Sequence, residues 1–221
     1  MSTEVKQQEK EGWAFTLDYP SYIPVMTYAQ SRDLRKTLFM AFNTKCAKGD
    51  ALDNQEIVRQ LVTLKQQRAK LLGYESHAHF TLEERMAKSP ETVFEFLNSL
   101  LEKAKPKAAL DVQEVAALAK KLDQLEVLEK WDFAYYSELL KKEKYALDEE
   151  ELRPYFSLEN VISGVFATAS RLFGLSFVAN SEIQVYHPEV TAYEVYDRDN
   201  QFLSVFYADF FPRPGKRNGA W

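Results

Sequence analysis

Apolar residues recur every three or four positions over most of the chain, which is the spacing of amphipathic helices. A serine, asparagine or aspartate before an apolar run predicts a helix start, and a glycine after it predicts the end. Pro106 falls inside the longest run and predicts a kink there. The helices expected from these signals cover residues 21–47, 53–73, 76–87, 90–125, 132–146 and 157–174, with a short acidic turn at 148–151.

The pattern changes near the end of the chain, where apolar and aromatic residues alternate with polar ones. Residues 190–196 and 202–209 are rich in Val, Tyr and Phe, and the polar run 197–201 separates them. Two such runs predict an antiparallel hairpin, which is marginal alone and should pack on the helices. After Asp209, two prolines and two glycines predict an irregular loop.

Together these patterns predict a mainly α fold, an array of long helices with a small antiparallel β-hairpin near the C-terminus. We expect a helical region over residues 1–182 and a hairpin plus irregular loop over residues 183–221, packed together as one unit. A hydrophobic content of 46% and an aromatic content of 14% are enough for a packed core.

Charge and cysteine usage narrow the class of protein. The net charge of −5 comes from intermixed acidic and basic residues, which argues against a nucleic-acid partner. The single Cys46, expected on a helix face, excludes an intrachain disulfide and suits a reducing compartment. No apolar run is long enough to span a membrane, and the polar start lacks the apolar core of a signal peptide. We therefore expect a cytoplasmic protein with no membrane partner.

The residues that could carry chemistry favour structural roles. His77 and His79 lie two positions apart, so on a helix they point to different faces and make a poor metal pair. His187 precedes Pro188 and is expected in extended backbone with a structural hydrogen bond. The acidic run 149–151 suits a helix start better than a catalytic pair. We predict no catalytic residue and no metal ligand in this chain.

A distinctive series of segments runs along the chain: LDYPSYIPVM, RDLR, LLGYESHAHFTLEERMA, WDFAYY, KYALDEEELRPYFSLENV, RLFGLSF, YHPEV, YEVYDRDN and FYADFFPRPGKRNGAW. In these segments the chain resembles the zinc metallopeptidase family of thimet oligopeptidase, oligopeptidase A and dipeptidyl carboxypeptidase. The bacterial peptidyl-dipeptidase branch is the most similar. The resemblance covers nearly the whole chain from about Gly12, and Asn218 departs from it because the family most often has glycine there.

A larger departure concerns the zinc motif. The resemblance implies an H-E-x-x-H helix some tens of residues beyond the Gly-Ala-Trp segment, followed by a glutamate that completes the zinc site. Histidines at i and i+4 share one helix face, and the glutamate between them can activate a metal-bound water. None of the three histidines, His77, His79 and His187, begins such a motif. The chain thus resembles an incomplete part of a larger neurolysin-like helical peptidase fold.

The resemblance implies the central, non-catalytic portion of a zinc-dependent oligopeptidase, of the type that releases C-terminal dipeptides from short peptides. Zinc would belong to the parent enzyme and not to this chain, which should be inactive alone. Its partners would be peptides and the missing C-terminal catalytic half. Exopeptidase and endopeptidase activity both remain open. The alternative is a non-enzymatic helical module that binds peptides or proteins and derives from the same scaffold.

The basic segment at the end of the chain holds the candidate substrate-binding residues. Arg213, Lys216 and Arg217 could bind a peptide carboxylate, or they could be surface charges paired with acids in the missing half of the parent enzyme. By resemblance, the residues beside Ala-Trp offer backbone groups to an extended substrate as an added strand. The candidates for this strand contact are Arg217, Asn218, Gly219 and Ala220, where glycine permits close approach.

Overall fold

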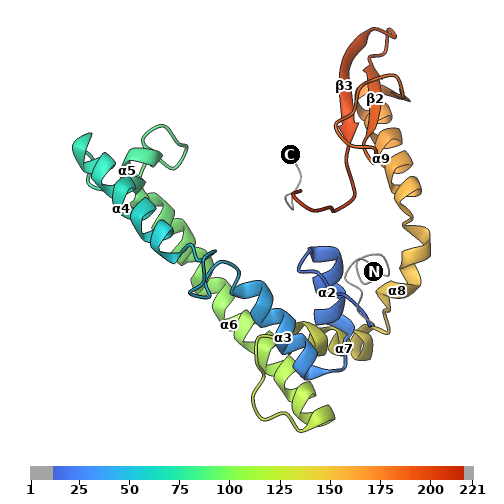
Figure 1. Ribbon diagram of the computed structural model, residues 1–221. Helices are drawn as coiled ribbons and strands as arrows, with labels where there is room; N and C mark the ends of the chain where they lie inside the picture. Colours follow the sequence, from blue (N-terminus) through green and yellow to red (C-terminus); the bar gives the residue numbers. More distant parts are fainter. Residues whose placement is uncertain (1–11, 217–221) are drawn as a thin grey trace. The chain divides into compact units, whose positions relative to one another are not determined.

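The structure is a computed structural model that describes residues 12–216. Contacts between residues group the chain into two compact units, Met1–Lys144 and Tyr145–Trp221, called unit 1 and unit 2 below. The boundary after residue 182 that the sequence predicts was placed where the pattern changes from helix to hairpin. The contacts instead group the last helix with the strands that follow it. In Figure 1 the colours run from blue through yellow in unit 1 and from gold to red in unit 2.

Unit 1 begins with two short helices where the pattern predicts one. Helix α2 spans Tyr19–Tyr28 and helix α3 spans Arg32–Asn43, and the two pack against each other. The chain is extended at Ala29, and the Ser31 hydroxyl then accepts a hydrogen bond from the Leu34 N–H as the cap of α3. The predicted single helix over 21–47 is therefore wrong, because a second capping serine restarts the helix.

Three further predictions in this region need correction. The helix starts after Asp18, whereas Ser21 uses its hydroxyl to accept a hydrogen bond from the Thr16 N–H. Cys46 lies in the turn after α3 with a φ of 54°, exposed and not on a helix face. The next short helix ends at Leu82, well before the expected residue 87.

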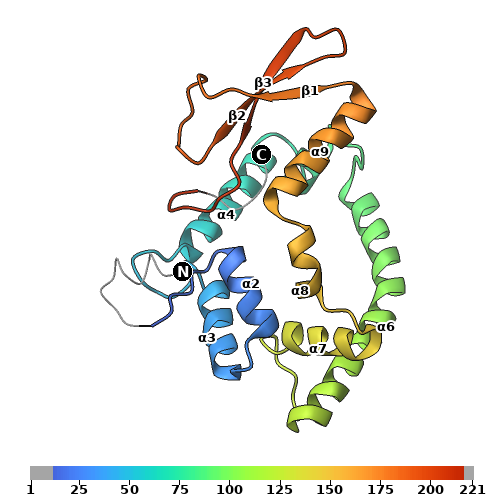
Figure 2. The same ribbon diagram turned by 90° about the vertical axis from the view of Figure 1, so that its right-hand side faces the viewer.

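The middle of unit 1 contains helices α4 (Gln55–Leu71), α5 (His77–Leu82) and α6 (Pro90–Asp123). Gly73, with a φ of 86°, follows α4, and the hydroxyls of Ser76 and Ser89 cap α5 and α6 as predicted. Helix α6 continues through Pro106 for 34 residues. Figures 1 and 2 show α6 as the long green helix.

The core of unit 1 lies where the end of α6 meets helix α7 (Phe133–Tyr145). Val115, Ala119 and Tyr136 are buried there. The partly buried residues packed against them are Leu125, Leu128, Tyr135, Leu139 and Leu140. A left-handed Gln124, with a φ of 54°, ends α6 and starts the return of the chain.

Unit 2 contains helix α8 (Glu149–Leu152), the 3₁₀ turn η1 (Arg153–Tyr155) and helix α9 (Leu158–Phe173). The expected caps are confirmed: the Asp148 carboxylate and the Ser157 hydroxyl each accept a backbone N–H at a helix start, and Gly174 ends α9 in the left-handed region. Strands β1 (Ser176–Ala179), β2 (Thr191–Tyr196) and β3 (Phe202–Ala208) follow.

The strands form one antiparallel sheet in the order β1-β2-β3. Strands β2 and β3 are the predicted hairpin, whose turn is closed by the Asp197 carboxylate as it accepts the N–H groups of Asp199 and Gln201. Strand β1 was missed because its four residues follow a helix too closely to show alternation. The mainly α class with a small antiparallel sheet near the C-terminus is confirmed.

One side of α9 packs on this sheet through aromatic rings. The Phe166 ring stacks on Phe177 of β1 with centroids 4.2 Å apart and meets Tyr193 of β2 edge-on at 4.9 Å. Phe206 of β3 completes the group at 6.1 Å from Phe166. Tyr193 and Phe206 are directly paired across β2 and β3, so both point to the face that α9 covers. Among the described residues, no helix is both long and apolar enough to cross a membrane.

Candidate functional site

A charged knot closes the loop that follows β3 in unit 2. The Asp209 carboxylate accepts two hydrogen bonds from the Arg213 guanidinium, with Nη1–Oδ1 at 2.7 Å and Nη2–Oδ2 at 2.8 Å. The Lys216 ammonium lies 2.9 Å from Oδ1, and the Tyr186 hydroxyl donates to Oδ2 at 2.9 Å. Four donors thus converge on one carboxylate, which has about four acceptor positions. We call these four residues, Tyr186, Asp209, Arg213 and Lys216, the Asp209 knot.

Lys216 is fully engaged within the knot. Besides Asp209 Oδ1, its ammonium donates to the backbone carbonyl of Asp209 at 2.6 Å and to that of Phe211 at 2.9 Å. An ammonium has three N–H donors, so all three are used. The side chains of Asp209, Arg213 and Lys216 are only 12, 19 and 23% exposed. The knot is therefore a structural closure of the loop, with little capacity left for a ligand on Lys216.

The electrostatics of the knot agree with its geometry. Hydrogen bonds from Arg213, and then from Lys216 and Tyr186, hold the pKa of the Asp209 carboxyl well below its ordinary value. The hydrogen bond to Asp209 raises the pKa of the Tyr186 hydroxyl, because the hydroxyl donates to a carboxylate. Asp209 consequently stays ionised, with its acceptor positions filled, and is not a free general base.

The structure brings two of the six sequence-predicted residues together. Arg213 and Lys216 share Asp209 as their partner, although the sequence analysis expected either a peptide carboxylate or acids elsewhere in the parent. Arg217, Asn218, Gly219 and Ala220 lie outside the described residues, so their predicted contact with substrate stays a prediction. Asp209 and Tyr186 were not among the predicted site residues. The i,i+4 spacing of Asp209 and Arg213 is the signal that could have found the first contact of the knot.

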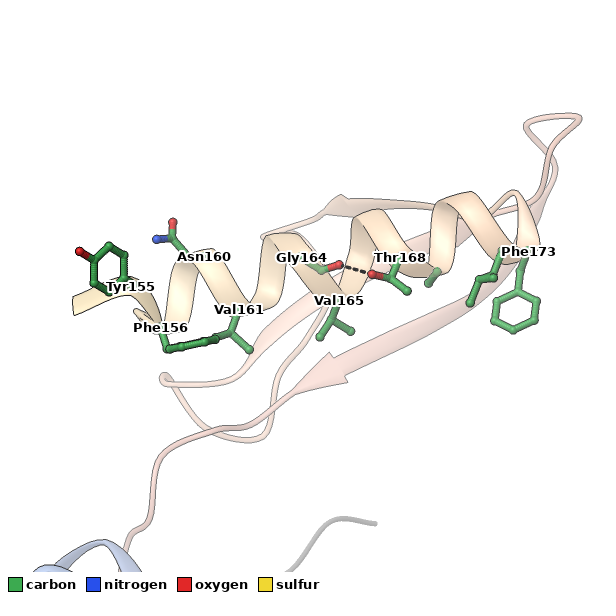
Figure 3. Close-up of a pocket in the computed structure, with 10 residues that line it drawn as sticks. Tyr155, Phe156, Asn160, Val161, Gly164, Val165, Thr168 and Phe173 are labelled. Carbon is green, nitrogen blue, oxygen red and sulfur yellow. Dashed lines mark hydrogen bonds between the residues drawn. The ribbon is translucent and has the colours of Figure 1, made fainter. Parts of the chain in front are cut away.

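A second feature of unit 2 is an apolar groove along α9. The groove has a volume of about 630 Å³ and is lined by Tyr155, Phe156, Asn160, Val161, Gly164, Val165, Thr168, Ala169, Leu172 and Phe173. Figure 3 shows Phe156, Val161, Val165 and Phe173 along one side of the helix, with Thr168 bonded back to the Gly164 carbonyl. The apolar spacing of this helix predicts that five residues face inward: Val161, Val165, Phe166, Ala169 and Leu172. Phe166 and Ala169 are partly buried, but within this chain Val161, Val165 and Leu172 are exposed.

Unit 1 holds a buried ion-pair cluster of the RDLR segment. Asp132, which is fully buried, accepts from Arg32 Nη2 at 2.8 Å and from Arg35 Nη2 at 3.1 Å. Arg35 is 1% exposed and also donates to the carbonyls of Ala29, Gln30 and Trp131. Its guanidinium stacks 4.2 Å above the Tyr135 ring. The cluster ties the ends of α2, α3 and α7 together, which is a structural role.

Asp132 has the depressed pKa of a paired carboxyl. Burial alone raises its pKa, but hydrogen bonds from Arg32, the Glu129 N–H and Arg35 outweigh burial and hold it below the ordinary value. Nearby, burial and a hydrogen bond to Asp123 raise the pKa of Tyr136 to about 12.

His79 and His187 each make local contacts within their own unit. His79 Nδ1 contacts the Ser76 hydroxyl, and its Nε2 lies 3.7 Å from both Glu75 and Glu91. His187 accepts the Glu189 N–H at 3.2 Å, a local structural bond of the kind expected. Over residues 12–216, no group of three or more His, Cys, Asp or Glu side chains is placed to hold a metal ion.

Comparison with known proteins gives this arrangement a context. The sequence profile of peptidase family M3 matches residues 25–221. Oligopeptidase A of Salmonella typhimurium is 36% identical over 222 residues, which is 99% of this chain and 33% of that protein. Dipeptidyl carboxypeptidase of the same organism is 37% identical over 96% of this chain and 31% of its own length. Probable cytosolic oligopeptidase A of Arabidopsis thaliana is 38% identical over 95% of this chain and 30% of its own length. The chain spans about a third of the length of these relatives.

Proposed function

Because the chain belongs to peptidase family M3, we propose that it forms the central, non-catalytic portion of a zinc-dependent oligopeptidase. One observation carries the proposal: the family match extends to Trp221, yet none of the three histidines begins an H-E-x-x-H motif. Relatives named oligopeptidase A and dipeptidyl carboxypeptidase match almost equally well, at 36 and 37% identity. Release of C-terminal dipeptides from short peptides is our proposed activity for the parent enzyme.

Zinc in the parent enzyme would be held outside this chain. A catalytic zinc needs three protein ligands and an open position, and the described residues offer no group of three. When bound, the metal polarises the peptide carbonyl and lowers the pKa of its water. In our proposal the helices of this chain line the peptide cleft, and its own residues bind and orient substrate without taking part in the chemical step.

Arg217, Asn218, Gly219 and Ala220 are the residues that we propose for peptide contact. Their backbone groups would pair with an extended substrate as an added strand, and Gly219 would allow the close approach. In the complete enzyme, Gly219→Val should weaken peptide affinity, whereas Asn218→Gly, which restores the residue common in the family, should not. Unchanged affinity in Gly219→Val would remove this part of the proposal.

Exposed apolar surface supports the interpretation of this chain as a portion of a larger protein and not as a stand-alone module. Many large apolar side chains of the described residues are exposed on α4, α6 and α9, among them Leu61, Phe94 and Val165. We propose that the remaining portion of the peptidase covers them. The cytoplasm, where a lone exposed thiol persists, is the proposed location.

The isolated chain offers a direct test. After dialysis against zinc it should hold no stoichiometric metal, and it should not cleave a fluorogenic peptide. Chelator-sensitive release of dipeptides by the chain alone would contradict the proposal. Dye binding to exposed apolar surface and light scattering test the alternative, because a self-contained binding module should be monodisperse and bind little dye.

A further inference from the structure

We propose that Asp209 is a positioning residue: through Tyr186, Arg213 and Lys216 it fixes the point at which the chain enters the proposed peptide-binding segment, Arg217–Ala220. This inference rests on the proposed function for the role of that segment. The role of the Asp209 knot as a clamp on the loop rests only on contacts among described residues.

The path of the chain leads from the sheet directly to the segment. Asp209 directly follows β3, which ends at Ala208, and Lys216 is the last described residue before the segment. The six residues between them include two prolines and a glycine and form no helix or strand. Such a loop has no backbone ladder to hold its shape, so its conformation depends on side-chain contacts.

The knot spans this loop from end to end. Asp209 at the start accepts from Lys216 at the end, and Lys216 also donates to the carbonyls of Asp209 and Phe211. Arg213, in the middle, makes a two-pronged contact with the same carboxylate, which fixes orientation as well as distance. One carboxylate therefore holds the loop at three places.

The knot also has an anchor outside the loop. Tyr186 lies in the connection between β1 and β2, and its hydroxyl donates to Asp209 at 2.9 Å. The Arg213 guanidinium lies 5.8 Å from the Tyr186 ring centroid, and that ring is 6.5 Å from Tyr207 of β3. The loop is thus fixed to the sheet that supports it and not only to itself.

These contacts separate the roles of the basic residues. Lys216 has all three N–H donors engaged, so its task is to close the loop and not to hold a substrate carboxylate. An edge strand presented to a peptide must keep a fixed direction for its backbone groups to pair in register. A clamp at Lys216 provides a fixed starting point for the residue that follows.

A lysine-specific protease tests the clamp in the chain as it stands. Cleavage after Lys216 requires its side chain to leave the knot and enter the protease. Asp209→Asn removes the charge without changing the shape and should raise the cleavage rate at Lys216 at least about tenfold, because cleavage follows the population of the opened loop. Cleavage at Lys48, an exposed turn residue of unit 1, provides the internal reference.

The matched control is Glu189→Gln. It removes one negative charge from the β1–β2 connection that contains Tyr186, where Glu189 lies 3.8 Å from His187 and is half exposed. This control should leave the Lys216 rate unchanged. If the circular dichroism spectrum of Asp209→Asn shows that this variant is unfolded, Arg213→Lys and Tyr186→Phe test the same clamp with a smaller change. Each should raise the cleavage rate at Lys216 about threefold through loss of one contact. A Lys216 rate that none of these variants changes overturns the clamp.

A second measurement tests the link to substrate. In active enzyme assembled from this chain and the proposed catalytic remainder, Asp209→Asn should raise KM for short peptides at least about fivefold with little change in kcat. A general loss of folding would lower the active fraction and hence kcat instead. An altered Lys216 rate with unchanged KM would leave the clamp intact and refute the peptide-binding role of the segment, so the two failures are distinguishable.

Discussion

The buried pair of Asp132 with Arg35 gives the sharpest prediction about stability. Asp132 is fully buried and Arg35 is 1% exposed, and their ion pair measures 3.1 Å. Asp132→Ala leaves the Arg35 charge buried without a carboxylate. Breaking a buried pair in this way typically costs about 3–5 kcal/mol. Arg35 keeps three backbone carbonyls and the Tyr135 ring, which favours the lower end, about 3 kcal/mol.

Urea or thermal unfolding followed by tryptophan fluorescence measures this effect, because Trp131 is partly buried beside the cluster and Trp13 is exposed. For a unit of this size, about 3 kcal/mol corresponds to a fall in Tm of about 10 °C. Asp111→Ala is the control, since Asp111 pairs with Lys107 on the surface of α6 and should cost only about 0.3–0.5 kcal/mol. A difference of less than about 1 kcal/mol between the two variants would refute the assignment of the cluster as the link between α2, α3 and α7.

Three further predictions follow from the same contacts. The pKa of Asp132 is depressed on folding, so the stability that it contributes is present above the unfolded pKa near 3.9 and is lost as pH falls through the folded pKa. Asp132→Asn should therefore flatten the pH dependence of the unfolding free energy of unit 1 below about pH 4. The pKa of Tyr136 is raised to about 12, so stability should fall as pH rises above about 10, and Tyr136→Phe should reduce that loss in alkaline unfolding curves. On α9, Phe166→Ala should lower the free energy of unfolding by about 2–4 kcal/mol, while Val165→Ser should change it by less than about 0.5 kcal/mol and reduce binding of an apolar dye. Equal costs for these two neighbours would contradict the one-sided packing of α9.

Local signals in the sequence predicted those elements whose ends depend on neighbouring residues. Ser76, Ser89 and Ser157 each cap the helix that they were expected to cap, and Gly174 ends α9. These bonds span three or four residues, so sequence spacing is enough to find them. The hairpin of β2 and β3 was predicted for the same reason, since Asp197 closes its turn locally.

Contacts between distant residues were beyond this reasoning. Asp132 was expected only as a helix cap, yet its partners Arg32 and Arg35 lie 100 and 97 positions earlier. Tyr186 reaches Asp209 over 23 positions. A pattern of apolar spacing also cannot say which apolar residues of α9 have a partner in this chain. Val161, Val165 and Phe166 were all placed inward, yet Val161 and Val165 are exposed and Phe166 carries the packing.

The most direct measurement is the nucleotide sequence of the reading frame beyond the codon for Trp221. The account predicts that the frame continues and encodes an H-E-x-x-H motif within some tens of residues, with a glutamate downstream that completes the zinc site. That result would make this chain the substrate-cleft scaffold of a zinc peptidase. A stop codon within a few residues of Trp221 would contradict the account and favour a binding module without the catalytic centre.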